Sequence, residues 1–284
     1  MKQYKLNIVI LFVLVQIALA NDNDFFQPRF HKEIPRKNEK ELKIKISGGA
    51  GVFYILPGDK DKIAIIDGYS DKESGKNLVD INYFVEDGIG YLELEMTHLK
   101  SGKKSGDEKW YIKLCDDLPT SLDIELGATK ADIDLGGLNL KNVKLSTGVS
   151  STNLKFTKPN KTIMRRFEIE AGLAKFDGEK LGNARFRSLN FSGGMGTFDL
   201  DLSGELIDDA DVNLSIGFGN LDVYLPKDVG AIIVSPSALF TSKKFDNFYK
   251  KGDKYISFNF NEVQKKINIF IESGLGNIKV RWID

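Results

Sequence analysis

The chain has 284 residues, with 40 basic and 40 acidic side chains and a formal net charge of zero. This balance gives no electrostatic reason to expect binding to nucleic acid or to an anionic membrane surface. Cys115 is the single cysteine, so an intramolecular disulfide is excluded and stability must come from packing and hydrogen bonds.

The first 20 residues differ in composition from the rest. Lys2 and Lys5 precede an apolar run of about 15 residues that ends in Ala18-Leu19-Ala20. A basic start, a short apolar stretch and small residues at the end are typical of a secretory signal peptide. An uncleaved anchor is the weaker alternative, because a membrane-spanning helix needs roughly 20 apolar residues. We therefore expect export to the periplasm or the cell surface, cleavage after Ala20, and no transmembrane segment in the mature chain.

Residues 21–40 are polar and contain two prolines, which predicts a linker between the signal peptide and the folded part. Its aromatic residues are possible docking points on that part. They are Phe25, Phe26 and Phe30.

From residue 41 to 284, apolar and polar residues alternate with period two, as in Phe198–Leu202 and Leu221–Leu225. This alternation is typical of strands that are buried on one face. No segment beyond the signal peptide has the periodicity of an amphipathic helix. The sequence therefore predicts one all-β domain.

A short motif recurs within this alternation, in which an apolar residue is followed by small residues and glycine. Aligned on the glycine, the central copies follow one another at steps of 21, 24, 22 and 23 residues. Such a period, with two strands a copy, predicts a β-solenoid of stacked coils with glycine-rich bends. Glycine suits these bends because it adopts strained backbone angles without steric cost and lets the next coil approach closely. The aligned glycines are Gly127, Gly148, Gly172, Gly194 and Gly217.

Two segments interrupt the repeat. Longer strands and a basic loop lie between residues 64 and 114, and an irregular, lysine-rich hairpin lies between residues 240 and 258. Because the ends of a solenoid expose strand edges that invite pairing with other chains, we expect these segments to cap or decorate the stack.

Several stretches resemble the bacterial toast-rack family, notably Leu122–Leu138, Leu181–Ala184 and Gly193–Gly204. This β-solenoid family is related to adhesin-like domains and to the C-terminal domain of cell-wall-active antibiotic response proteins. The resemblance implies the fold, an envelope or surface setting and a scaffold or adhesive role. It implies no catalytic residue. The copy at Gly127 departs from the family pattern, with Thr129 where a second glycine is usual.

Metal and nucleotide sites are not predicted. His31 and His98 are the only histidines and lie far apart, so no zinc-type cluster forms locally. Gly193–Asp199 is similar to a calcium-binding nonapeptide, but the aspartate comes one residue late. The Gly-x-Gly pairs that begin at Gly217 and Gly274 are followed by strands, whereas a pyrophosphate site needs a helix.

Nucleophilic catalysis has equally little support. A Ser/His/Asp arrangement would rely on His31 in the linker or His98 beside a loop, and there is no Gly-x-Ser-x-Gly motif. Cys115 is interpreted as a strand residue rather than a nucleophile.

Pairs of acidic residues are the strongest enzymatic signal, since paired carboxylates hydrolyse or cleave polysaccharides on other solenoids. Asp132 and Asp134, and likewise Asp199 and Asp201, project from one strand face about 7 Å apart. Nearly every strand carries polar residues at such positions, so the preferred interpretation is a solvated face.

The sequence therefore predicts an exported, non-catalytic structural or interaction module without metal or cofactor, such as an adhesin or an envelope scaffold. Its partner would be a protein or an envelope polysaccharide. A carbohydrate-active enzyme and an envelope-stress sensor domain stay open as alternatives.

Overall fold

The structure is a computed structural model that describes residues 28–69, 79–96, 108–207, 209–236 and 240–283. In this part of the chain almost all regular structure is strand, and η1 is a single 3₁₀ turn. The predicted signal peptide and its cleavage site lie outside the described residues. The elements are β1 Phe30–Pro35, β2 Glu41–Pro57, β3 Lys62–Tyr69, β4 Val79–Glu86, β5 Ile89–Met96, β6 Lys109–Leu114, β7 Thr120–Asp134, β8 Leu140–Lys155, β9 Arg166–Glu179, η1 Leu181–Ala184, β10 Ser188–Asp201, β11 Ala210–Pro226, β12 Val229–Val234, β13 Phe240–Phe245, β14 Phe248–Lys251, β15 Lys254–Ser257 and β16 Lys265–Ile283.

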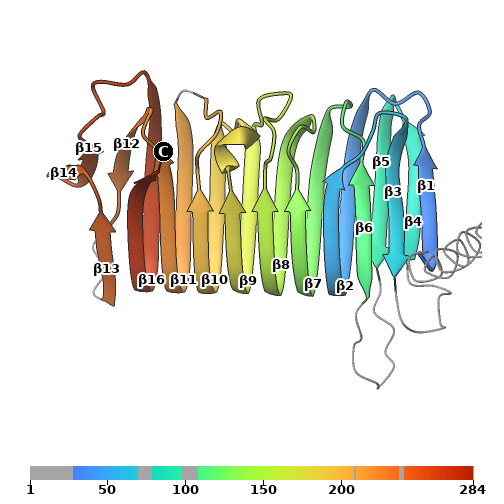
Figure 1. The fold of residues 1–284 in the computed structure, drawn as a ribbon, viewed down its shortest axis with the longest axis horizontal. Coiled ribbons are helices and arrows are strands. Elements are labelled where there is room, and N and C mark those ends of the chain that lie inside the picture. Colours follow the sequence, from blue (N-terminus) through green and yellow to red (C-terminus); the bar gives the residue numbers. More distant parts are fainter. Residues whose placement is uncertain (1–27, 70–78, 97–107, 208, 237–239, 284) are drawn as a thin grey trace, which may run out of the picture.

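Seven long strands form the body of the molecule. In the order β2, β7, β8, β9, β10, β11 and β16 they lie side by side and pair in parallel. Each is bent in its middle into two halves (Figure 1). The bends line one long edge, the lower edge in Figure 1, which we call the bend edge, and the connections between coils line the opposite return edge. The predicted solenoid is confirmed, and the two strands of a copy are the two halves of one continuous strand.

The glycines aligned in the sequence stack on one another at the bend edge. A Cβ atom built on Gly194 would lie 2.7 Å from the carbonyl oxygen of Gly172, and one built on Gly217 would lie 2.7 Å from that of Gly194. Real Cβ atoms do not approach backbone this closely, so the alignment reflects the close approach of neighbouring coils. The predicted register is therefore confirmed.

The strained backbone lies elsewhere than the sequence pattern indicates. Gly194 does not have a positive φ, whereas Gly196, two residues later, has φ +154° and Gly219 has φ +135°. At the equivalent position of the earlier coil β7 stands Thr129, which is buried and has no positive φ. The close approach of neighbouring coils thus requires glycine at the aligned position. A positive φ requires glycine at a second position, two residues later, and only in some coils.

Inward side chains from the two halves of each strand form one continuous core. Sizes are matched across the bend: a Cβ on Gly193 would lie 2.6 Å from the ring of Phe198, so the missing side chain gives the ring its space. Phe198 in turn packs edge-on against Phe191 at a centroid distance of 5.3 Å. Each such buried ring contributes roughly 1.5–3 kcal/mol, and only the stack as a whole buries it.

Both ends of the stack carry extra strands, as expected for capping segments. At the amino-terminal end, β5 and β4 continue one half-sheet, and β6, β3 and β1 continue the other. At the carboxy-terminal end, β12, β15 and β14 follow the first half of β16, and β13 follows its second half. These strands cover the outer coils of the solenoid.

The segment expected to be a linker is partly folded. Residues 30–35 form β1, which pairs antiparallel with β3. Phe30 packs against Trp110 with ring centroids 6.0 Å apart, which confirms it as a docking point. The polar composition of this segment hid the strand because β1 is an edge strand with only Ile34 buried. Phe25 and Phe26 lie outside the described residues.

Candidate interaction surface

One member of each acidic pair is used to hold a turn at the return edge. Asp201 accepts hydrogen bonds from the backbone N–H of Ser203 (2.7 Å) and of Lys180 (3.2 Å). Asp134, largely buried, accepts from the N–H groups of Gly136 and Thr157 and from the Thr157 hydroxyl at 2.7 Å. These carboxylates cap turns by the side-chain-to-backbone bonding typical of aspartate. They do not simply face solvent, as the sequence suggested.

The other members lie on the outer face of the second half-strands. Asp132 pairs with Lys155 at 2.9 Å. Asp199 stands in register between Asp177 and Asp222, so three aspartates stack on neighbouring strands at about 4.8 Å. We call these three the carboxylate ladder.

Like charges directly opposite one another are unfavourable, and here they act on partly buried groups. Burial raises the pKa of the Asp199 carboxyl above its ordinary value, and the charges of Asp222 and Asp177 raise it further. Lys175 and Arg281, which lies 3.4 Å from Asp222, only partly offset this rise in the pKa of Asp199. The ladder is thus a local cost to the fold.

Asp199→Asn should therefore leave the protein at least as stable at pH 7. A carboxyl group whose pKa is raised by folding destabilises the folded state wherever it is ionised, and that penalty disappears as the pH falls below its unfolded value. The advantage of the variant should shrink as the pH falls from 7 toward 4. Urea unfolding at several pH values measures this, and a variant clearly less stable than wild type at pH 7 would contradict it.

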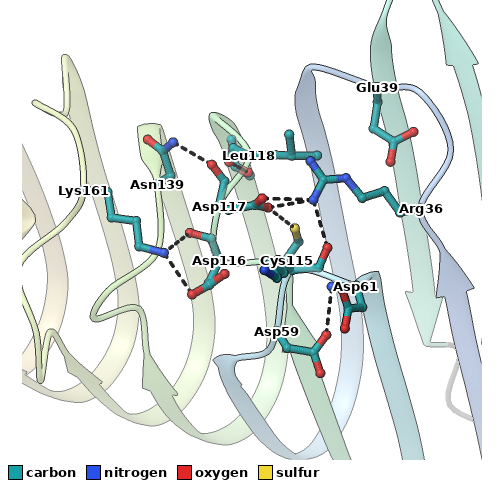
Figure 2. A network of polar contacts seen from close by, with 12 residues as sticks. Arg36, Glu39, Asp59, Asp61, Cys115, Asp116, Asp117, Leu118, Asn139 and Lys161 are labelled. Carbon is teal, nitrogen blue, oxygen red and sulfur yellow. Dashed lines mark hydrogen bonds and ion pairs between the residues drawn. The ribbon is translucent and has the colours of Figure 1, made fainter.

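Cys115 lies in a polar network at the return edge (Figure 2). Its thiol is 3.0 Å from Asp117, and Arg36 donates to both carboxylate oxygens of Asp117 at 2.9 and 3.1 Å. Burial raises the pKa of the Cys115 thiol, and its hydrogen bond to Asp117 raises it further. A buried thiol that resists ionisation is a poor nucleophile.

The same network explains what these residues do for the fold. Burial opposes ionisation of Asp117, but the hydrogen bonds from Cys115 and Arg36 outweigh it, so its pKa is lowered. Arg36 also donates to the carbonyl of Lys60 at 2.9 Å. Lys161, in the connection between β8 and β9, donates to Asp116, as Figure 2 shows. The network therefore fastens the amino-terminal strands to the first coils.

The other candidate groups are structural or lie outside the described part. His31 is exposed, 2.6 Å from Asp67, where β1 meets β3. His98 lies outside the described residues. Gly217 and Gly274 belong to the aligned stack of bend glycines. Among the described residues, no three acidic, histidine or cysteine side chains are placed to hold a metal ion.

The most unusual surface feature is a straight row of large apolar side chains along the bend edge. Each follows the aligned glycine of its strand, and register places them next to one another. They are between 42% and 60% exposed, and five strands at about 4.8 Å give a row of large side chains roughly 19 Å long. We call this row the bend ladder. It comprises Val149, Leu173, Met195, Phe218 and Leu275, preceded by Ala50 and Ala128 and followed by Phe240.

A groove of about 900 Å³ runs beside the bend ladder, on the side of the first half-strands. Its floor is the row of aligned glycines, which have no side chains to fill it. Its outer wall carries serine hydroxyls and carboxylates, and Met96 stands at its amino-terminal end. The wall residues are Ser47, Glu95, Glu125, Ser146, Glu170, Ser192 and Ser215.

Comparison with known families agrees with this architecture. The model described as the N-terminal domain of toast_rack, DUF2154, matches residues 23–179, more than half of the chain. The chain belongs to the toast-rack family. A second model, described as cell wall-active antibiotics response LiaF, C-terminal, matches residues 178–280 of this toast-rack protein. The two matches together run from residue 23 to residue 280.

Several solved structures are similar to the toast-rack chain. A structure described as a "putative cell adhesion protein" from Clostridium sporogenes is 21% identical, with a TM-score of 0.47, over 90% of this chain and 100% of its own. One described as a "putative adhesin" from Bacteroides fragilis is 14% identical, with a TM-score of 0.36, over 90% and 99%. Comparison with curated proteins gave no match.

Proposed function

We propose that the protein is exported and acts at the cell envelope as a non-catalytic structural or interaction module. The observation that carries the proposal is the bend ladder, a row of large exposed apolar side chains held in register by the solenoid. Contiguous exposed apolar surface on a soluble domain is typical of an interaction site. The partner would be a protein or an envelope polysaccharide.

The distribution of the carboxylates supports a non-catalytic role. A pair working as acid and base needs one group protonated and one ionised beside a substrate cleft. Here Asp134 and Asp201 are bound to turn amides, and Asp132 is paired with Lys155. The groove lies across the bend from the carboxylate ladder, on the other half-strands.

Two further observations favour an envelope setting. Residues 1–20 have the pattern of a cleaved signal peptide, and residues 178–280 match a domain described by a response to cell wall-active antibiotics. That match also favours a second candidate function, a sensor domain in envelope stress. In the described residues, no helix is long and apolar enough to cross a membrane.

Turnover of polysaccharides tests the proposal against the enzymatic alternative. The purified protein, incubated with a panel of acidic and neutral polysaccharides, should release no new reducing or unsaturated ends. Asp199→Asn, in the carboxylate ladder, and Glu272→Gln, on the first half of β16, serve as a matched pair. Turnover by wild type that falls roughly 10²–10⁴-fold in Asp199→Asn but persists in Glu272→Gln would establish an enzyme instead.

A further inference from the structure

We propose that the bend edge is a self-association surface, on which a second copy of this chain lies face to face with its coils stacked in the same direction. The inference rests on the proposed function, because it names the partner of the same surface. It follows from three properties of that surface: its shape, its symmetry and its charges.

The shape is that of a ridge beside a matching groove. The bend ladder projects, with Leu173 52% and Met195 51% exposed. The groove lies directly beside it, since Gly172 and Gly194, which form part of its floor, immediately precede these ladder residues. Ridge and groove both repeat once a coil. A second bend edge therefore offers side chains at the spacing that the groove requires.

Symmetry decides how two such edges meet. Two copies of one face are related by a two-fold axis lying in that face, running either along the ladder or across it. An axis along the ladder, running between ladder and groove, exchanges the two sides of the bend edge. Rotation about it places the ladder of each copy over the groove of the other. Rotation about the axis across the ladder lays ladder on ladder and leaves both grooves empty. Shape therefore favours the first axis.

The charges favour the same axis independently. On β7, Glu125 stands on the groove side and Lys130 on the far side of the ladder; on β9, Glu170 and Lys175 repeat the arrangement. Rotation about the axis along the ladder brings the glutamates of one copy to the lysines of the other, whereas the other axis brings like charges together.

These charged groups are available for such contacts. Glu125 and Glu170 keep about half of their side-chain surface while pairing with Lys45 at 3.2 Å and Lys144 at 3.7 Å. Lys130 and Lys175 are exposed, and neither makes an ion pair within the described residues. Four cross-copy pairs can therefore form in this orientation.

The size of the surface sets the strength. The bends of the seven long strands form an edge roughly 29 Å long, and its width is close to the spacing of packed sheets, about 10 Å. The area of such a contact is well below the roughly 1,600 Å² of a standard interface. We therefore expect a weak, reversible dimer and not a permanent one.

Sedimentation velocity of the purified protein over a range of concentrations tests the contact. Wild type should shift from monomer to dimer, and Leu173→Asp should raise the dissociation constant roughly tenfold or more. Ile163→Asp is the matched control, because Ile163 is 38% exposed but lies outside the bend edge. A wild type that stays monomeric to about 1 mM, or equal effects of the two variants, would overturn the proposal.

Charge exchange tests the orientation. Glu170→Lys and Lys175→Glu should each weaken the dimer, because each places like charges opposite one another. The double variant Glu170→Lys/Lys175→Glu should recover it, and an equimolar mixture of the two single variants should form a heterodimer. Failure of both to recover the dimer would overturn the orientation along the ladder.

The two proposals fail separately. A monomeric protein without turnover would refute self-association but leave the interaction module intact. Polysaccharide turnover by a dimer would refute the non-catalytic role but leave the contact intact. A third outcome would assign the bend edge to polysaccharide instead of a second copy: the wild-type protein is monomeric and is retained on a glycan column, and the Leu173→Asp variant is not retained.

Discussion

Gly196→Val should unfold the central coils or lower the free energy of unfolding by several kcal/mol. A Cβ atom at position 196 would lie 1.8 Å from the carbonyl oxygen of Ala174, which belongs to the backbone of the preceding coil, β9. The residue also has φ +154°, which a β-branched side chain adopts only at a cost of about 1–3 kcal/mol. Neither the clash nor the strain can relax without moving the stack. Urea unfolding followed by circular dichroism measures the loss.

Two controls separate the causes of that loss. Gly88→Ala, in the turn between β4 and β5, also has positive φ (+75°), but nothing lies within 4 Å of the added Cβ, so it should cost only about 1 kcal/mol. Gly194 does not have a positive φ, but Gly194→Ala would place a Cβ 2.7 Å from the carbonyl oxygen of Gly172. Any loss of stability in this variant therefore reports the close approach of the coils alone. If Gly196→Val proved no more harmful than Gly88→Ala, close stacking at this position would be wrong.

The repeat could be predicted because its cause recurs in every central coil. A glycine at the aligned position is required wherever one coil passes over the carbonyl of the previous one, as at Gly194 over Gly172. That requirement recurs once a coil and is visible as a period in the sequence. The apolar residues that alternate around it report burial in the same direct way.

The bend ladder could not be predicted by alternation. Period two from Phe191 and Gly193 places Met195 inside, yet Met195 is 51% exposed. The bend turns two consecutive residues outward, and inward positions resume only at Phe198, an odd number of residues after Gly193. A large apolar residue directly after the aligned glycine in five coils was the available signal. Whether that residue points inward or outward depends on where the bend interrupts the alternation of inward and outward side chains.

The roles of the acidic pairs were also hidden, because both members look like outward positions of a strand. Asp134 and Asp201 end their strands, so their carboxylates reach the amides of the following turn. Asp-Leu-Gly after a strand is a recognisable turn signal for Asp134. The repulsion within the carboxylate ladder, by contrast, arises only from pairing between coils.

Asn160→Leu should be among the most damaging substitutions outside the bends, with a loss of roughly 3–5 kcal/mol. The Asn160 side chain is 1% exposed, and its amide accepts from the N–H of Leu140 and donates to the Leu140 carbonyl, both at 2.8 Å. A third bond, also 2.8 Å, goes to the carbonyl of Thr162. Leucine has a similar volume but removes the partner of two buried backbone groups, the N–H and carbonyl of Leu140, and of the partly buried Thr162 carbonyl. Each buried group left without a partner costs about 1–3 kcal/mol.

The matched control is Asn213→Leu, whose amide bonds Asn190 at 2.9 Å on an exposed strand face. Water can replace that bond, so the change should stay within about 0.5 kcal/mol. Hydrogen exchange localises the effect: the Leu140 amide should lose protection in Asn160→Leu and keep it in Asn213→Leu. Equal losses of stability in the two variants, with Leu140 still protected, would show that the buried amide does not hold the return edge together. A selective loss would show that the stack depends on the return edge as well as on the glycines of the bends.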